Sequence, residues 1–109
     1  MPYAAATLDS TFQALADPTR RALIAQLRGG VARVTDLADQ HSMSLNAVSK
    51  HIKVLEGAGL VERRIEGREH LIGLRAEPLA YAEAWIEQYR EFWLARLGRL
   101  DRLMKDSTR

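Results

Sequence analysis

One short amphipathic segment constrains this chain most, because both its ends and both its faces are defined. Apolar residues recur there at steps of three and four, which predicts a helix with one buried stripe. These residues are Leu45, Val48, Ile52 and Leu55. Ser44 is a typical N-cap, and the sequence GAG of residues 57–59 ends the segment. We therefore predict a helix that packs one face against a core.

The opposite face of this predicted helix is polar and basic along its first two turns. It carries Asn46, Ser49, Lys50 and Lys53, and no acidic residue precedes Glu56. An ordinary solvent-exposed helix alternates both charge signs along its surface. The absence of acids indicates a partner that carries negative charge.

The charge of the whole chain is small, but its distribution is uneven. The net charge is +2, from 16 basic and 14 acidic residues. Basic and acidic residues balance over 1–41 and over 76–109, whereas residues 42–75 hold six basic and four acidic residues. A local basic excess is typical of a phosphate-binding surface. A solvated basic face is the alternative, because an excess of two charges is small.

Length and composition limit the class of protein. A chain of 109 residues with 47% apolar and 28% charged residues is typical of one folded, soluble domain. No apolar run approaches the roughly 20 residues that span a bilayer, and the first ten residues lack a signal-peptide pattern. The chain has no cysteine, which excludes disulfides and cysteine metal sites. We expect a cytoplasmic protein with no membrane partner.

The remaining elements follow from caps, breaks and a change of period. Asp17-Pro18 is a strong helix start, and Thr35 is predicted to cap a short helix with Val34 as its hydrophobic staple. After Leu60 the pattern changes to two short strands with Gly67 in their turn. The predicted elements are helices over 8–16, 18–28, 36–41 and 45–57, strands over 60–65 and 70–75, and one helix over 79–104.

This order predicts a mainly α protein with a small β-hairpin. Two helices joined by the four-residue turn HSMS and followed by a hairpin are a winged helix-turn-helix arrangement. The predicted organisation is an N-terminal tail over 1–7, a winged helix-turn-helix domain over 8–104 and a C-terminal tail over 105–109. Within the domain, we assign the helix-turn-helix to 33–57, the wing hairpin to 60–75 and a dimerisation helix to 79–104.

Four segments carry a family resemblance. They resemble the ArsR (ArsR/SmtB) family of bacterial winged helix-turn-helix transcriptional repressors. The matching segments are ADPTRRALIAQL, VTDLADQHSMSLNAVSKHIKVLEGAGLV, RRIEGREHLIGL and the tail AWIEQYREFWLARLGRLDRLM. The resemblance covers about residues 8–104. It implies a homodimer that binds double-stranded DNA at a partly palindromic operator and represses transcription. Many relatives release DNA on binding a ligand, so an unidentified small-molecule or protein inducer is a further implied partner.

The sequence departs from the metal-sensing members of this family. Where they carry Cys-Val-Cys, this chain reads RVT over residues 33–35, and its last helix contains no histidine. Metal sensing therefore does not carry over, and we expect no metal site and no cofactor. His41, His51 and His70 have no ligand-like spacing, and we expect His51 to be half-buried and hydrogen-bonded. The sequence shows no candidate nucleophile, no set of metal ligands and no phosphate-binding loop, so we do not expect an enzyme.

The resemblance and the exposed helix face together predict a DNA-binding surface. Asparagine can pair with adenine and lysine with guanine in the major groove, while Lys53, one turn further on, and His70 are better placed for phosphates. Arg68 at the predicted wing tip is a candidate for the minor groove. The residues predicted to contact DNA are Thr35, Ser44, Asn46, Ala47, Ser49, Lys50, Lys53, Arg64, Arg68 and His70.

The last predicted helix has an apolar face too wide for one domain. Its 26 residues would span roughly 39 Å. A second copy of the chain is the expected partner, and an intramolecular core is the alternative. The residues predicted at the dimer interface are Tyr81, Trp85, Ile86, Tyr89, Trp93, Leu97 and Leu100. A winged-helix module that binds another protein, and not DNA, is the alternative function.

Overall fold

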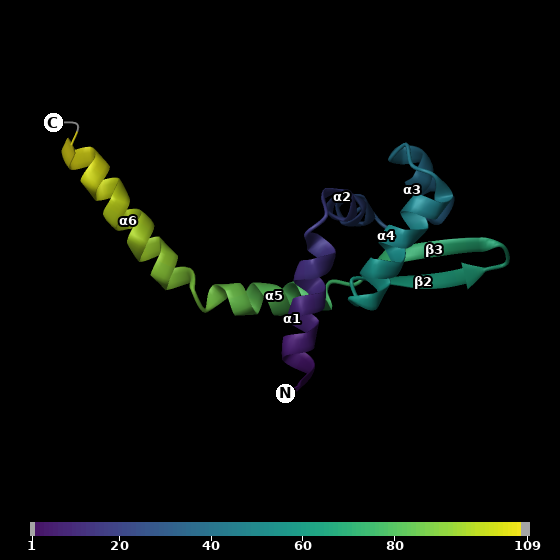
Figure 1. Ribbon diagram of the computed structural model, residues 1–109, viewed down its shortest axis with the longest axis horizontal. Coiled ribbons are helices and arrows are strands. Elements are labelled where there is room, and N and C mark those ends of the chain that lie inside the picture. The colour runs from purple at the N-terminus through teal and green to yellow at the C-terminus, as the bar shows by residue number, and fades with distance from the viewer. Residues whose placement is uncertain (1, 108–109) are drawn as a thin grey trace.

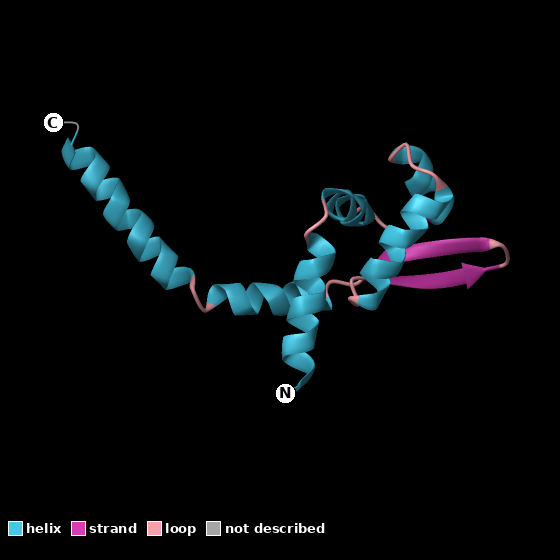
Figure 2. Cartoon of the chain, in the orientation of Figure 1, coloured by secondary structure: helices cyan, strands magenta, loops and turns pink. Residues whose placement is uncertain are grey.

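The computed structural model describes residues 2–107, which form helices and a small antiparallel sheet whose hairpin projects at one end of the molecule (Figures 1 and 2). The order of strands in the sheet is β1-β3-β2, so β3 is central. The elements are α1 (Pro2–Leu15), α2 (Pro18–Leu27), β1 (Ala32–Arg33), α3 (Val34–Gln40), α4 (Leu45–Gly57), β2 (Val61–Glu66), β3 (Glu69–Leu74), α5 (Glu77–Glu87) and α6 (Arg90–Ser107). This is the predicted winged helix-turn-helix arrangement.

The core is built around the buried face of α4. Val48, Ile52 and Leu55 are fully buried, as their spacing predicts. Leu45 belongs to the same predicted stripe, but it is 52% exposed. Leu45 is the first residue of α4, and it lines a surface cleft instead of entering the core. The other large, fully buried apolar residues are Leu23, Leu37, Leu60 and Ile72.

Two predicted helix caps are confirmed by their hydrogen bonds. The Asp17 carboxylate accepts from the backbone N–H of Arg20 at 3.0 Å, at the start of α2. This hydrogen bond is the main cause that lowers the pKa of Asp17 below its ordinary value. The Ser44 hydroxyl accepts from the backbone N–H of Ala47 at 3.1 Å, at the start of α4. Both caps satisfy donors that the first helical turn leaves without partners.

The predicted cap at Thr35 is wrong, and a short strand explains why. Ala32 and Arg33 pair with β3, so the chain stays extended up to Arg33. It then enters α3 directly, with Arg33 at the N-cap position and Val34 buried inside the first turn. Thr35 is therefore an exposed residue of the helix. A strand of two residues has no periodicity by which the sequence could indicate it.

The C-terminal helix also differs from the prediction. The expected single helix over 79–104 is divided at Gln88 and Tyr89 into α5 and α6 (Figure 2). The backbone N–H groups of Gln88 and Tyr89 bond to carbonyls three residues back, not four, and this tighter turn redirects the axis. The predicted tails are largely helical, because α1 begins at Pro2 and α6 continues to Ser107.

Helix α6 leaves the body of the molecule as an arm (Figure 1). The radius of gyration is 18.7 Å, whereas a compact chain of this length has a value of about 13 Å. Every side chain of α6 from Arg90 to Asp106 is exposed. Within residues 2–107, no helix is both long and apolar enough to cross a membrane. Among the described residues, the arm is thus a helix without a covered face.

Thr11 offers a test of the packing between α1 and its neighbours. Its side chain is fully buried, and its hydroxyl finds no hydrogen-bond partner in the described chain. Replacing Thr11 with valine, which has nearly the same shape, should raise the free energy of unfolding by about 1 kcal/mol, because an unsatisfied buried hydroxyl is removed. Urea denaturation measures this difference.

The matched control for this prediction is Thr11→Ala. It also removes the hydroxyl, but it leaves a small cavity, so it should be less stable than Thr11→Val. A Thr11→Val protein that unfolds at lower urea than the wild type would contradict the prediction.

Candidate DNA-binding surface

The outer face of α4 carries most of the predicted base-contacting residues. Asn46, Lys50 and Lys53 are exposed, and Ala47 and Ser49 are half-buried beside the core stripe. The helix has no acidic residue in its first turn. Since the apolar residues of the stripe are buried from Val48 onward, the polar face must point outward. The early turns of α4 are therefore a rigid, polar and basic edge of the domain.

A cleft of about 470 Å³ lies between α4, the start of α3 and the hairpin. It brings together residues that lie far apart in the sequence. Four of the predicted DNA-contacting residues line it: Thr35, Ser49, Arg68 and His70. The other lining residues are Arg33, Val34, Leu45, Arg63 and Glu69. Ser49 of α4 and the wing residues Arg68 and His70 thus line one cleft.

The hairpin presents its turn at one end of this surface. Glu66 and Glu69 form the last pair of the β2–β3 register, so the turn is Gly67-Arg68. Gly67 has a φ of 62°, in the left-handed region that glycine adopts without cost. Arg68 follows it and is exposed at the tip.

Arg64 does not join the same surface. Side chains alternate along a strand, so Arg64 points away from the face that carries Arg63. It lines a separate hollow with Val31 and Leu71, and it forms an ion pair with Glu66 at 3.0 Å. Of the predicted DNA-contacting residues, Arg64 is therefore placed apart from α4.

Arg63 holds the wing against α4, a role that the sequence alone does not indicate. Its guanidinium donates to the Glu56 carboxylate at 2.8 Å and 3.3 Å. It also lies 2.9 Å from Nδ1 of His70 on the neighbouring strand. Because arginine can only donate, this His70 nitrogen is the acceptor. Three residues from α4, β2 and β3 thus hold the wing against α4.

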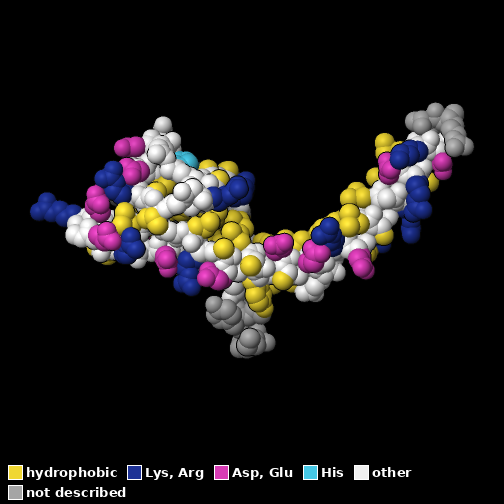
Figure 3. Space-filling model, turned by 180° about the vertical axis from the view of Figure 1, so that it is seen from behind, with side chains coloured by type: hydrophobic (Ala, Val, Ile, Leu, Met, Phe, Trp, Pro, Cys, Tyr) yellow, Lys and Arg dark blue, Asp and Glu magenta, His cyan; other side chains and the backbone are white. Residues whose placement is uncertain are grey.

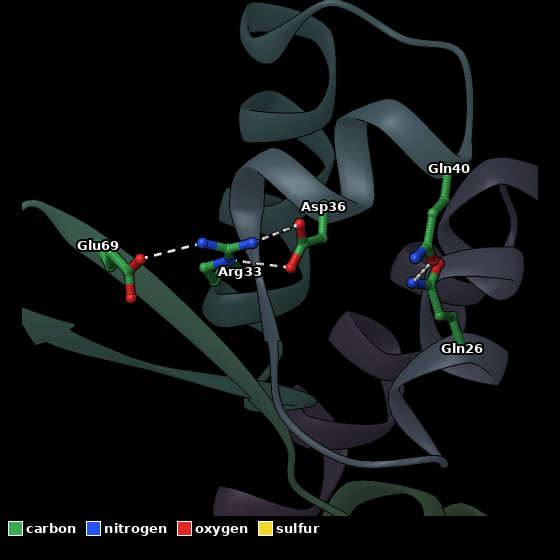
Figure 4. A network of polar contacts seen from close by, with 5 residues as sticks. All are labelled: Gln26, Arg33, Asp36, Gln40 and Glu69. Atoms are coloured by element: carbon green, nitrogen blue, oxygen red, sulfur yellow. Dashed lines mark hydrogen bonds and ion pairs between the residues drawn. The ribbon is translucent and has the colours of Figure 1, made fainter.

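Arg33 holds the other side of the wing (Figure 4). It donates to both oxygens of Asp36 at 3.0 Å and 3.1 Å, and to Glu69 at 3.1 Å. The hydrogen bonds to Asp36 and then to Glu69 raise the pKa of Arg33, and the Arg33 guanidinium lowers the pKa of Asp36. The sequence signal was only the i, i+3 spacing of Arg33 and Asp36.

The first two helices are tied to the helix-turn-helix by side chains. Arg20 donates to the carbonyls of Ala14 and Gln13, and its guanidinium lies 3.4 Å from Nδ1 of His51. His51 is half-buried, as predicted, and braces α4. Gln26 contacts Gln40 at the end of α3 (Figure 4), and its side-chain oxygen also lies 2.6 Å from Nε2 of His41. The Arg20–His51 contact thus joins α2 to α4, and the Gln26 contacts join α2 to the end of α3.

Three cations of the predicted DNA-binding set make no ion pair within residues 2–107. They are Lys50, Lys53 and Arg68. In contrast, Arg33, Arg63 and Arg64 all have carboxylate partners. Within the predicted DNA-binding set, the positive charge without a carboxylate partner therefore lies on α4 and at the wing tip. In the described part of the chain, no group of three or more His, Asp or Glu residues is arranged to hold a metal ion.

A second surface runs along α5 and α6. All seven residues of the predicted interface are exposed. Trp85 packs edge-on against Phe12 of α1, with 5.8 Å between ring centroids, and its ring lies 5.2 Å from that of Tyr89. Figure 3 shows apolar side chains along one edge of the arm, with charged side chains on the other. The exposed apolar edge is continuous from the body to the arm.

Comparison with known proteins shows which protein family this chain resembles. The profile of a family described as a helix-turn-helix domain matches residues 15–64. The chain is 45% identical over 71 residues to the HTH-type transcriptional regulator NmtR of Mycobacterium tuberculosis, and the match covers 65% of this chain and 59% of that protein. The match thus spans less than two thirds of that relative.

Solved structures match over more of their length. A crystal structure of an ArsR family transcriptional regulator is 39% identical, with a TM-score of 0.76, and the match covers 82% of this chain and 92% of that chain. The solution structure of a homodimeric winged helix-turn-helix DNA-binding domain from Mycobacterium bovis is 25% identical, with a TM-score of 0.65, over 80% of this chain and 81% of that one. Together with the helix-turn-helix, the wing and the exposed basic face of α4, these matches place the chain in the ArsR family of DNA-binding transcriptional regulators, a family of regulators and not of enzymes.

Proposed function

We propose that the protein is a homodimeric repressor that binds a partly palindromic operator and does so without a metal ion. The observation that carries this proposal is the outer face of α4, where exposed lysines have no carboxylate partner in the described chain and Ser49 shares a cleft with Arg68 and His70 of the wing. Helix-turn-helix proteins place such a helix in the major groove.

The residues of this surface fall into two groups, according to which part of the DNA each is proposed to contact. Asn46, Ser49 and Lys50 lie on the early turns of α4, where side chains meet base edges, and Ala47 leaves room for close approach. We propose that phosphates are contacted by a second set around them, which is Thr35, Ser44, Lys53 and His70, and that Arg68 enters the minor groove. Arg64 contributes only to the general potential, because it lies on the opposite face of the hairpin and is paired.

The proposed dimer uses the apolar edge of α5 and α6. Trp93, Leu97, Leu100 and Met104 recur at steps of four, three and four, a spacing typical of helices that pack along one another. Burying such side chains stabilises an interface by about 1.5–3 kcal/mol each. The related domain from Mycobacterium bovis is homodimeric, which supports the same assembly here. Two-fold symmetry then sets the operator half-sites about 10 base pairs apart, or a multiple of that.

A dimer bound over a promoter would exclude polymerase, which is the basis of the proposed repression. A regulator of chromosomal genes works in the cytoplasm, and we propose that location. An inducer, either a small molecule or a protein, would act by favouring a dimer geometry in which the two α4 helices no longer fit successive grooves. We propose no metal for this role, because residues 33–35 read RVT and the chain has no cysteine.

The experiment that tests the function is a mobility shift with the promoter region upstream of the protein's own gene, at about 0.15 M salt, where exposed charges are screened as in the cell. We expect a retarded complex with two protomers that an excess of unrelated duplex does not displace. A promoter-reporter fusion should then show lower expression when the protein is present. Equal displacement by every duplex, or no complex at all, would reject the proposal and favour the protein-binding alternative.

The wing tip provides a sharper prediction. Arg68→Ala should reduce operator affinity and should lower the salt dependence of binding by about one ion per protomer, because a protein that neutralises fewer phosphates releases fewer counterions. Affinities measured by fluorescence anisotropy across a salt series give the slope.

The matched control is Arg64→Ala, which removes the same charge from the opposite face of the same hairpin. It should change the slope less than Arg68→Ala does. Equal effects of the two substitutions would mean that the wing acts only through net charge.

A further inference from the structure

Leu45 is an apolar side chain in the middle of a polar surface. It is the first residue of α4, and it is 52% exposed, although the next residues of its stripe are fully buried. Single exposed leucines are common on proteins and need no explanation by themselves. This one lies in the cleft shared by α4 and the wing, together with Ser49 and Arg68.

The helix geometry places Leu45 where bases are read. Ser49 follows it by four residues, so the two side chains lie on the same face, one turn apart. Leu45 is on the N-terminal side, and the N-terminal residues of a recognition helix approach base edges most closely. If the proposed function holds and α4 enters the major groove, the isobutyl group of Leu45 enters it too.

The major groove offers one apolar group to such a side chain. Of the four bases, only thymine presents a methyl group there, at C5, whereas the groups that distinguish guanine, adenine and cytosine are hydrogen-bonding atoms. An isobutyl group cannot satisfy a donor or an acceptor, so facing cytosine N4 would leave that amino group without a partner. We propose that Leu45 is a specificity-determining residue that contacts the methyl group of one thymine in each operator half-site. This inference rests on the proposed function of α4.

Deoxyuridine tests the contact directly, because it lacks only the methyl group of thymidine. Operator duplexes selected with the wild-type protein would carry deoxyuridine at one thymine at a time. We expect one position per half-site at which wild-type affinity falls about four-fold, the effect of removing one buried methyl group. Substituting that position in both half-sites should lower the affinity about 15-fold, as two independent contacts would.

Leu45→Ala supplies the second half of the test. The variant should fold normally, since the side chain is outside the core, and it should bind the thymine operator several-fold more weakly than the wild type. Its affinity should no longer change when deoxyuridine replaces the sensitive thymine. The matched control is Val54→Ala, because Val54 is 43% exposed on the same helix but does not line the cleft. That variant should keep the sensitivity of the wild type to deoxyuridine.

The outcomes separate this inference from the proposed function. A Leu45→Ala protein that keeps the full deoxyuridine effect, or a wild-type protein insensitive at every thymine, would overturn the thymine contact while specific DNA binding stands. A protein that selects no operator would overturn the proposed function and this inference together.

Discussion

Replacing Trp93 with glutamate should turn the dimer into monomers and remove specific DNA binding. Trp93 is 37% exposed on the arm, within the apolar edge that we propose as the interface. Truncation of a buried aromatic anchor typically costs at least about 2 kcal/mol, and a dimer contains two of them. The dimer dissociation constant should therefore rise about a thousand-fold.

Trp93→Glu should weaken both dimerisation and operator binding. Sedimentation velocity at micromolar concentration should give the mass of one chain for Trp93→Glu and of two chains for the wild type. Operator affinity should fall by more than about a hundred-fold, because a monomer reads only one half-site.

The control for this experiment is Arg102→Gln. It changes the net charge by the same amount and lies nine residues further on, which is the opposite side of the helix. It should remain dimeric and bind the operator as the wild type does. A Trp93→Glu protein that stays dimeric would mean that the edge of α6 is not the interface.

The two lysines of α4 should differ in what they contribute to DNA binding. Lys53→Ala should weaken binding to all sequences similarly, and it should lower the salt dependence by about one ion for each phosphate that the side chain no longer neutralises. Lys50→Ala and Asn46→Ala should each cost about 1–3 kcal/mol on the operator and relax the preference at one base position per half-site.

These variants are controls for one another. Lys50 and Lys53 are both exposed, lie on the same helix and carry the same charge. A difference between the effects of their substitutions on DNA binding is therefore due to their positions on the helix. Affinity across a library of single-base operator changes is the decisive measurement. If no variant alters affinity or preference while the fold is intact, α4 is not a reading helix.

The elements whose signals are local could be predicted from the amino-acid sequence. The stripe of Val48, Ile52 and Leu55 defines a helix from residues within four positions of each other, and the caps at Asp17 and Ser44 use backbone N–H groups three residues away. The hairpin also follows from a short-range pattern with a glycine in its turn. Such signals need no knowledge of the rest of the chain, so the fold class was predictable.

The candidate site could be predicted only as a set of side chains. Asn46, Lys50, Lys53 and Arg68 were identified because they are polar or basic and adjoin a predicted buried face or turn. Which of them share one surface depends on how the hairpin docks on α4. Alternation along β2 removes Arg64 from that surface, and its direction is set by the pairing with β3.

The contacts between elements, and the course of the chain beyond the body, follow only from how the elements pack in three dimensions. Arg33 joins α3 to Glu69, and Arg63 joins α4 to the wing, through partners on other elements. The exposure of Leu45 and the division of the last helix after Glu87 have the same origin. Periodicity reports which face is apolar, but whether that face is covered depends on elements that periodicity does not place.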